Sequence, residues 1–267
     1  MKGINNASTQ TTALITGASS GIGAELAKVF ARHGHNLVLV ARNQDRLFRL
    51  AQDLSAAFNI SVTVIAKDLA TPTAVPDLVA EVQEAGVRIS HLVNNAGMDV
   101  YGCFYNTDWQ QELQMIKLNL ISLTQLTKLL LAEMRQQRSG RILNLGSTGS
   151  FVPSPLNTVY AATKAYVWSF FAALAEELRG TGVTVTALCP GATRTEFQAR
   201  AHIGRVRLLR FGVLEAANVA EVGYRAMMSG RRVVVPGLYN QAHILLARLL
   251  PSSLVVRMAK EMLLPVS

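Results

Sequence analysis

Short apolar runs recur along the chain, separated by longer segments whose apolar residues are spaced three to four positions apart. Apolar runs of this length are typical of strands that are covered on both faces. The longer segments have the period of amphipathic helices. Seven strands are predicted in this way, at residues 13–16, 36–41, 62–65, 91–93, 142–145, 183–188 and 233–235.

Helices are predicted between these strands. Gly34 stops the first helix, Pro76 opens the third, and Asp108 caps the fourth. Strands that alternate with helices imply right-handed crossovers, so an α/β protein is expected, doubly wound, with a mostly parallel seven-stranded sheet and helices on both faces. The helical segments are 22–33, 42–58, 76–84, a long one from Asp108 to near Gly140, one through Tyr160 and Lys164 to about Arg179, and 215–228.

One domain accounts for the chain. About half of its 267 residues are hydrophobic, and dividing them between two full domains would leave both cores small. Residues 13–237 are expected to form the domain, with a polar N-terminal extension at 1–12 and a helical tail at 238–267 that is split near Pro251. Charged residues make up 16% of the chain, so disorder is expected at the ends alone.

A cytoplasmic protein is expected. The first dozen residues lack the apolar core of a signal peptide, and no apolar run reaches the roughly eighteen residues that a bilayer span needs. Cys103 and Cys189 are too few to staple a chain of this size and are interpreted as reduced thiols. The five histidines show no metal-ligand spacing, so no metal site is predicted.

The net charge of +9 allows three interpretations. Nucleic-acid binding would need basic residues clustered with aromatics, and with only 6% aromatics no nucleic-acid partner is expected. An anionic cofactor or substrate accounts for part of the charge. Basic residues also crowd the last quarter beside many leucines, which leaves an ordinary basic surface and a membrane surface open. For the tail itself, a cover over the substrate pocket or an oligomer interface is favoured over peripheral membrane contact.

A glycine-rich turn joins the first strand to the first helix, with the pattern Thr16-Gly17-x-x-x-Gly21-x-Gly23. Gly17 allows the tight turn, Gly21 lets a phosphate approach the backbone, and Gly23 lets the helix pack on the strand. A pyrophosphate would then rest at a helix N-terminus, where N–H groups and the dipole favour an anion. The spacing differs from G-x-G-x-x-G, so a purely structural turn is the alternative.

The residue after the second strand bears on the choice of cofactor. An acidic residue there would bind a free ribose 2′-hydroxyl, but the chain has Ala41 and Arg42, with Arg46 one turn later. A guanidinium suits a 2′-phosphate, which favours NADP(H) over NAD(H); a solvent-exposed arginine is the alternative. Asp68, after the third strand, is placed to accept a hydrogen bond from adenine or to cap the next turn.

Tyr160 and Lys164 lie one helical turn apart on one face. In a partly desolvated pocket a cation favours the phenolate, which makes a phenol of ordinary pKa about 10 a usable proton donor at neutral pH. Alone, such a pair is more often a half-buried ring beside a solvated charge.

Four loops and one helix give this pair its context. Gly17, Asn95, Ser147 and Gly191 each follow the carboxyl end of a different predicted strand, and Tyr160 lies on the helix after Ser147. Ligands of an open parallel sheet bind at that edge. A ligand crevice that includes Tyr160 is therefore predicted.

The chain resembles the short-chain dehydrogenase/reductase family, in its single-domain branch with a Rossmann fold. This resemblance implies NAD(P)-dependent oxidation of an alcohol or reduction of a carbonyl. The matching motifs span residues 16 to 196 and are, in order, Thr16-Gly17-Ala18-Ser19-Ser20-Gly21-Ile22-Gly23, Asn94-Asn95-Ala96-Gly97, Asn119, Ser147, Tyr160-Ala161-Ala162-Thr163-Lys164 and Pro190-Gly191.

The resemblance also implies roles for single residues. Tyr160 is the general acid/base, Lys164 lowers its pKa and holds the nicotinamide ribose, Ser147 binds the substrate oxygen, and Asn119 holds a water in a proton relay. Hydride arriving at a carbonyl carbon leaves negative charge on oxygen, which the two hydroxyl donors suit. The expected cofactor contacts are Gly17, Ser19, Ser20, Gly21, Ile22, Gly23, Arg42, Asp68, Leu69, Asn95, Ala96, Gly97, Tyr160, Lys164, Pro190, Gly191, Thr193 and Thr195.

The sequence thus predicts an NADPH-dependent oxidoreductase for a hydrophobic carbonyl or alcohol, in a homo-oligomer (dimer or tetramer). Two alternatives are an NADP(H)-binding regulatory protein without catalysis and a membrane-associated 3-ketoacyl or keto-steroid reductase. The substrate pocket is expected at residues 98–105, 148–157 and 192–214, and its apolar walls are Phe104, Phe151, Val152, Pro153, Leu156 and Phe211.

Overall fold

The structure is a computed structural model that describes residues 10–201, 203, 206–210 and 212–265. Most of the predicted N-terminal extension and Phe211 of the predicted pocket lie outside these residues. The strands are β1 (Thr12–Thr16), β2 (Asn36–Ala41), β3 (Val62–Ala66), β4 (Ile89–Asn94), β5 (Gly140–Leu145), β6 (Val183–Leu188), β7 (Thr193–Arg194), β8 (Leu214–Glu215) and β9 (Val233–Val234).

The α-helices lie largely where the periodicity predicts them. Those between the strands of the main sheet are α1 (Gly21–Arg32), α2 (Gln44–Phe58), α3 (Ala74–Glu84), α4 (Trp109–Ile116), α5 (Leu123–Gln136), α6 (Thr158–Glu177), α7 (Phe197–Arg200) and α8 (Ala216–Met228). The tail forms α9 (Leu238–Leu249) and α10 (Ser252–Leu263), split at Pro251 as predicted.

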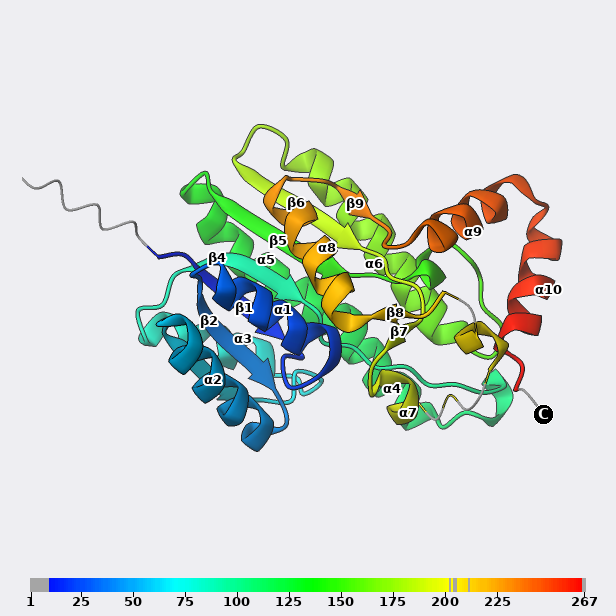
Figure 1. Cartoon of the computed structure of the whole chain (residues 1–267), viewed down its shortest axis with the longest axis horizontal. Coiled ribbons are helices and arrows are strands. Elements are labelled where there is room, and N and C mark those ends of the chain that lie inside the picture. Colours follow the sequence, from blue (N-terminus) through cyan, green and yellow to red (C-terminus); the bar gives the residue numbers. More distant parts are fainter. Residues whose placement is uncertain (1–9, 202, 204–205, 211, 266–267) are drawn as a thin grey trace, which may run out of the picture.

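The main sheet has seven parallel strands in the order β3-β2-β1-β4-β5-β6-β9, which confirms the predicted fold class. The order reverses between β1 and β4, where an open sheet leaves a crevice at its carboxyl edge. Figure 1 shows helices on both sides of the sheet.

Two apolar layers hold the helices to the sheet. On one face Leu78 of α3, Leu126 of α5 and Phe171 of α6 pack on alternate residues of the strands, among them Leu14. On the other face α1, α2 and α8 pack on the intervening residues, such as Ile15. Because successive strand residues point to opposite faces, an apolar strand supplies both layers.

Some element boundaries differ from the prediction. Thr12 already belongs to β1, and α3 begins at Ala74, so Pro76 is its third residue rather than its first. The long helix capped by Asp108 is interrupted by a π-helical segment, Lys117–Ser122, which carries Asn119. Nothing in apolar periodicity marks such an insertion, because a π-turn shifts the register by one residue only.

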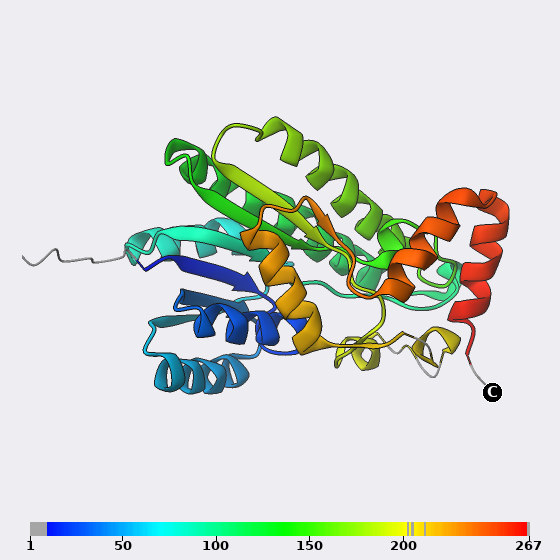
Figure 2. The same ribbon diagram turned by 45° about the horizontal axis from the view of Figure 1, so that its top comes forward.

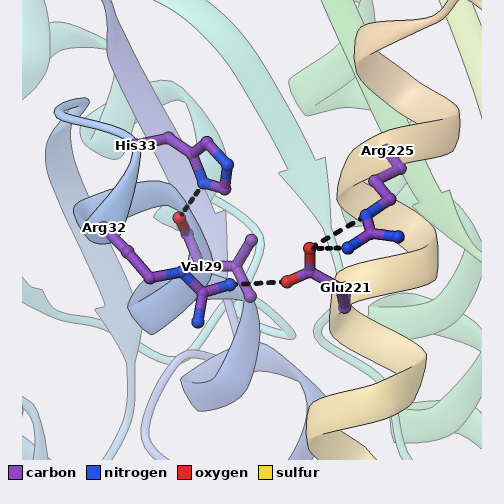
Figure 3. Close-up of polar contacts among 5 residues, drawn as sticks. All are labelled: Val29, Arg32, His33, Glu221 and Arg225. Atoms are coloured by element: carbon purple, nitrogen blue, oxygen red, sulfur yellow. Dashed lines mark hydrogen bonds and ion pairs between the residues drawn. The ribbon is translucent and has the colours of Figure 1, made fainter.

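An ion pair between Arg32 and Glu221 joins α1, the helix that follows the glycine turn, to α8. Figure 3 shows Glu221 of α8 between two arginines, at 2.5 Å from Arg32 and 3.0 Å from Arg225. His33, just past α1, closes the helix end through Nδ1, 2.8 Å from the carbonyl oxygen of Val29. The Arg32 pair links the two helices and the Arg225 pair lies within α8, and because both arginines are exposed to solvent, neither pair contributes much to stability.

The tail helices α9 and α10 project beyond the sheet at the end of the molecule opposite the described N-terminal residues (Figure 2). Among the described residues, the helical stretch Trp109–Gln136 is long and apolar enough to cross a membrane, although core helices of soluble proteins pass the same test. Leu126, Leu130 and Met134 of this stretch are buried against the sheet.

Candidate active site

A cavity of about 620 Å³ lies at the carboxyl edge of the sheet. It extends from the ends of β2 and β3 past the glycine turn to the start of α6. Nearly every predicted cofactor contact lines it, namely Gly17, Ser19, Ser20, Gly21, Ile22, Arg42, Asp68, Leu69, Asn95, Ala96, Gly97, Tyr160, Lys164, Pro190, Gly191, Thr193 and Thr195. Ser147 lines it too, whereas Gly23 and Asn119 do not.

The glycine turn has the conformation that its sequence predicts. Gly17 and Gly21 have φ values of 66° and 56°, in the left-handed region that favours glycine. The side chain of Ser20, the N-cap residue of α1, does not cap the helix. Gly21 and Ile22, the first two residues of α1, line the cavity, so the positive end of the helix dipole lies beside it, as an anionic phosphate requires.

Gly23 lies where α1 comes close to the glycine turn. A Cβ there would stand 2.4 Å from the carbonyl oxygen of Gly17 and 2.4 Å from Nδ2 of Asn95. Asn95 uses that nitrogen to donate to the carbonyl oxygens of Thr16 and Gly17, at 2.8 and 3.2 Å. Gly23 therefore leaves room for the close approach of α1 to the residue after β1 and for the amide that ties the glycine turn to the end of β4.

Basic residues gather at the β2–β3 end of the cavity, where Arg42, Arg46 and Lys67 all contribute to the lining. Arg46 pairs with Glu196 at 2.7 Å and thereby links α2 to the segment after β7. Asp68 uses Oδ1 to accept from the amide of Ala70 at 3.0 Å, so the turn-capping alternative holds for that oxygen.

Tyr160, Lys164 and Ser147 meet at the opposite end of the cavity. The Ser147 hydroxyl lies within hydrogen-bonding reach of the Tyr160 phenol, and it also accepts from the amide of Gly149 at 3.0 Å. Lys164 is buried, with Nζ donating to the carbonyl oxygen of Leu145 at 2.8 Å and standing 5.7 Å from the centre of the Tyr160 ring. The predicted convergence of these three side chains is therefore seen.

The predicted lowering of the Tyr160 pKa is not met in this geometry. Burial raises the pKa of the phenol, the charge of Asp99 raises it further, and the hydrogen bond with Ser147 opposes both. Burial also lowers the pKa of Lys164 to about 8. Desolvation penalises the charged form of each group, so burial alone moves the two pKa values in opposite directions.

Asn119 acts as a brace in this structure. Its Oδ1 accepts from the amide of Met98 at 3.0 Å, and its Nδ2 donates to the carbonyl oxygen of Met98 at 3.0 Å and to Oγ1 of Thr163 at 3.1 Å. It thereby joins the π-helical segment, the loop after β4 and α6.

A second brace, which no sequence pattern predicts, lies beside the first. Asp99 and Asn157 are both buried, and Nδ2 of Asn157 donates to Oδ2 of Asp99 at 2.8 Å. Burial raises the pKa of Asp99 to about 7, while the charge of Lys164 opposes the rise. An aspartate two residues after an Asn-Ala-Gly motif carries no periodic or spacing signal, so only the fold reveals it.

Of the described residues in the three segments predicted to form the substrate pocket, only those of 192–214 line the cavity, and the predicted apolar walls Phe104, Phe151, Val152, Pro153 and Leu156 do not line it. The 192–214 segment contributes Phe197, whose ring centre is 5.9 Å from that of Tyr160. Phe104 is instead 60% exposed, and Phe151 packs on Trp168 with Arg248 over its ring. Neither ring lines the cavity, because Phe104 is exposed at the surface and Phe151 packs on Trp168 of α6.

Comparison with known proteins agrees with this geometry. The short chain dehydrogenase family matches residues 11–204. An uncharacterized oxidoreductase of Staphylococcus epidermidis is 33% identical over 223 residues, which cover 84% of this chain and 93% of that protein.

Two solved structures show the same architecture. A short-chain dehydrogenase from Sphingobium yanoikuyae in complex with NADPH is 36% identical, covers 90% of this chain and 94% of its own, and has a TM-score of 0.81. A bulky-bulky ketone specific alcohol dehydrogenase from Comamonas testosteroni is 32% identical, covers 90% and 92%, and has a TM-score of 0.76. The chain therefore belongs to the short-chain dehydrogenase/reductase family of oxidoreductases.

Proposed function

We propose that the protein is an NADP(H)-dependent oxidoreductase that interconverts a hydrophobic carbonyl compound and its alcohol. The observation that carries the proposal is the placement of the Ser147 and Tyr160 hydroxyls at one end of a cavity whose other end is basic. A dinucleotide has the matching polarity, with its phosphates toward the glycine turn and Arg42 and its nicotinamide toward Tyr160.

The residues divide the chemistry between them. The bound cofactor supplies or accepts the hydride. Tyr160 is the general acid in reduction, and its phenol donates a proton to the oxygen on which negative charge develops as hydride reaches the carbonyl carbon. Ser147 donates to the same oxygen, so two donors meet the charge that develops there. Lys164, whose Nζ is held by the carbonyl oxygen of Leu145, orients the nicotinamide ribose. Asn119 belongs to the proton path.

Three arginine and lysine side chains support a preference for NADP(H). Arg42, Arg46 and Lys67 surround the place where a 2′-phosphate would lie. Guanidinium groups bind a phosphate dianion by paired hydrogen bonds, which a ribose hydroxyl cannot match. The S. yanoikuyae structure, solved with NADPH, supports the same preference.

A hydrophobic substrate is supported by Phe197 beside Tyr160 and by the C. testosteroni relative, whose name specifies bulky ketones. A homo-oligomer is supported by an apolar groove along α5 and α6, lined among others by Ile121, Leu129 and Tyr166, which are all well exposed. We keep a cytoplasmic location as part of the proposal.

The decisive experiment replaces Tyr160 by Phe and follows NADPH absorbance with a panel of apolar ketones and aldehydes. Loss of the hydroxyl is expected to reduce kcat by about 10²- to 10⁴-fold, with little change in NADPH affinity. Tyr166→Phe is the matched control, because Tyr166 lies on the same helix and its hydroxyl, among the residues that the structure describes, bonds only Thr124, at 3.0 Å.

Turnover of the Tyr160→Phe variant at the rate of the unmodified protein would overturn the mechanism. NADPH binding without turnover of any compound in the panel would favour the alternative of a cofactor-binding regulatory protein. The close pairing of Ser147 with Tyr160 argues against that alternative, since binding alone needs no positioned proton donor.

A further inference from the structure

Helix α9 presents an apolar stripe to solvent. Leu238, Ala242, Leu245 and Leu249 recur at helical spacing on its outer side, and the three leucines are 83%, 60% and 73% exposed. Its inner side carries the buried residues Asn240 and Ile244. This is the reverse of an ordinary surface helix, whose polar side faces water.

Helix α10 continues the apolar surface and adds positive charge. Leu254 and Met258 are each 42% exposed, one turn apart. Arg257 and Lys260 are exposed beside them, and within the described part of the chain neither forms an ion pair. The acidic residue of α10, Glu261, is neutralised by Arg207 at 3.2 Å.

We infer that α9 and α10 dock on an anionic lipid surface. The docking surface is hereafter called the tail face and consists of Leu238, Ala242, Leu245, Leu246, Leu249, Leu254 and Met258, with the basic side chains Arg248, Arg257 and Lys260 around it. Leucines that enter the headgroup boundary while arginine and lysine meet lipid phosphates are the pattern of helices that lie in a membrane interface.

A second copy of the chain fits the tail face less well. In a symmetric contact each residue meets the same patch of its partner, so the basic rims of two copies would approach one another. Such like-charge juxtaposition is unfavourable, and the net charge of +9 adds to it. An anionic lipid surface would instead attract the basic side chains of the tail face.

The tail face is attached to the candidate active site. Tyr101, in the loop after β4, donates to the carbonyl oxygen of Leu263, and Arg248 stands 5.5 Å over the ring of Phe151. Asn240 packs so closely on Gly191 that a Cβ there would be 2.3 Å from its Oδ1. Docking through α9 and α10 would therefore hold the loops around the site beside the lipid. Figures 1 and 2 both show these helices at the extremity of the molecule, free to meet a surface.

The test is co-sedimentation of the purified full chain with phosphatidylcholine vesicles, with and without phosphatidylglycerol. Binding is expected to the phosphatidylglycerol vesicles and to weaken as salt is added. The double variant Leu245→Glu/Leu249→Glu should lower the bound fraction at least about tenfold. Arg257→Ala/Lys260→Ala should weaken binding to phosphatidylglycerol vesicles by up to about 30-fold, which is what two surface cations contribute.

Phe48→Glu is the matched control, because Phe48 is an exposed apolar residue on α2, far from the tail, and its replacement should leave sedimentation unchanged. Thermal unfolding and NADPH titration establish that each variant is folded. If the double variant Leu245→Glu/Leu249→Glu does not fold, Leu245→Ser/Leu249→Ser replaces it. Absence of vesicle binding, equal binding by the folded Leu245 and Leu249 variants, or a dimer in light scattering that these variants abolish would overturn the inference. All three readouts are independent of enzymatic turnover.

Discussion

Asn157 holds Asp99 by a 2.8 Å hydrogen bond from its side-chain amide to a buried carboxyl oxygen. Asn157 is the N-cap residue of α6, three positions before Tyr160, and Asp99 follows Met98, whose peptide is held by Asn119. The loop after β4 is thereby bonded to the start of the helix that carries the proposed proton donor. The other oxygen of Asp99 has no hydrogen-bond partner among the described residues, which makes its ionisation costly.

The stability of the protein is expected to depend on the charge of Asp99. Its pKa is about 7 in the folded chain and about 3.9 in an unfolded one. The unfolded state therefore loses this proton first, and the free energy of unfolding falls as pH rises from about 4 to about 7. At about 1.4 kcal/mol per pH unit, the fall approaches an upper bound of about 4 kcal/mol.

Asp99→Asn should remove this fall. The free energy of unfolding of the variant should therefore increase relative to that of the unmodified protein as pH rises through that window. Urea unfolding at a series of pH values measures the difference. Asp53→Asn, an exposed residue on α2, should leave the pH dependence as it is. Parallel curves for Asp99→Asn and the unmodified protein would show that the carboxyl is already ionised at low pH.

The fold and much of the site were open to prediction from sequence for a physical reason. Strands that are buried on both faces must be apolar throughout, and the crossover rules leave few ways to connect them. Residues that directly follow such strands, among them Gly17, Asn95 and Ser147, are then placed at one edge without knowledge of their contacts. Their convergence in one cavity follows from backbone topology alone.

Contacts between side chains distant in sequence were not open to prediction in this way. The bonds of Asn119 with Met98 and Thr163 depend on a π-turn, and the shift of the Tyr160 pKa depends on how much protein surrounds its hydroxyl. The exposed stripe of α9 is a further case, because its leucines have the spacing of a core-facing helix. Which side of a helix faces the core is decided by its packing, not by its period.

Gly23 and Gly34 are expected to tolerate alanine very differently. A Cβ at Gly23 would overlap Gly17 and Asn95, so Gly23→Ala must displace the turn that would hold the cofactor phosphates. We expect a loss of about 3 kcal/mol in the free energy of unfolding and of most NADPH binding. Gly34 has φ of 78° and nothing within 4 Å of a Cβ, so Gly34→Ala should cost only about 1–2 kcal/mol of backbone strain.

Chemical denaturation and NADPH titration of the two variants test this contrast. Both must be measured, since stability alone cannot separate strain from displacement of the turn. Unimpaired NADPH binding by Gly23→Ala would contradict the assignment of the glycine turn as the phosphate site.

Substitutions of Arg42 and Glu196 are expected to shift the preference for NADPH over NADH in opposite directions. Arg42→Ala removes a guanidinium from the proposed 2′-phosphate site and should weaken NADPH binding about 10- to 100-fold while sparing NADH. Glu196→Gln releases Arg46 from its 2.7 Å ion pair and removes a negative charge, so NADPH binding should strengthen about two- to fivefold. Fluorescence titration with both cofactors gives the ratio directly. An NADPH to NADH ratio that Arg42→Ala leaves unchanged would refute the proposed preference.

Asn119 should matter for stability as well as for turnover. Asn119→Ala leaves both polar groups of the Met98 peptide without their partner, and we expect a cost of about 2–4 kcal/mol in the free energy of unfolding. Thr163→Val removes only the 3.1 Å bond to the same amide and should cost about 1 kcal/mol. If Asn119 also belongs to the proton path, kcat of Asn119→Ala should fall further than that of Thr163→Val when both are assayed well below their unfolding temperatures. Equal stability of Asn119→Ala and the unmodified protein would rule out the brace, and a change in stability without any in kcat would leave Asn119 as a brace alone.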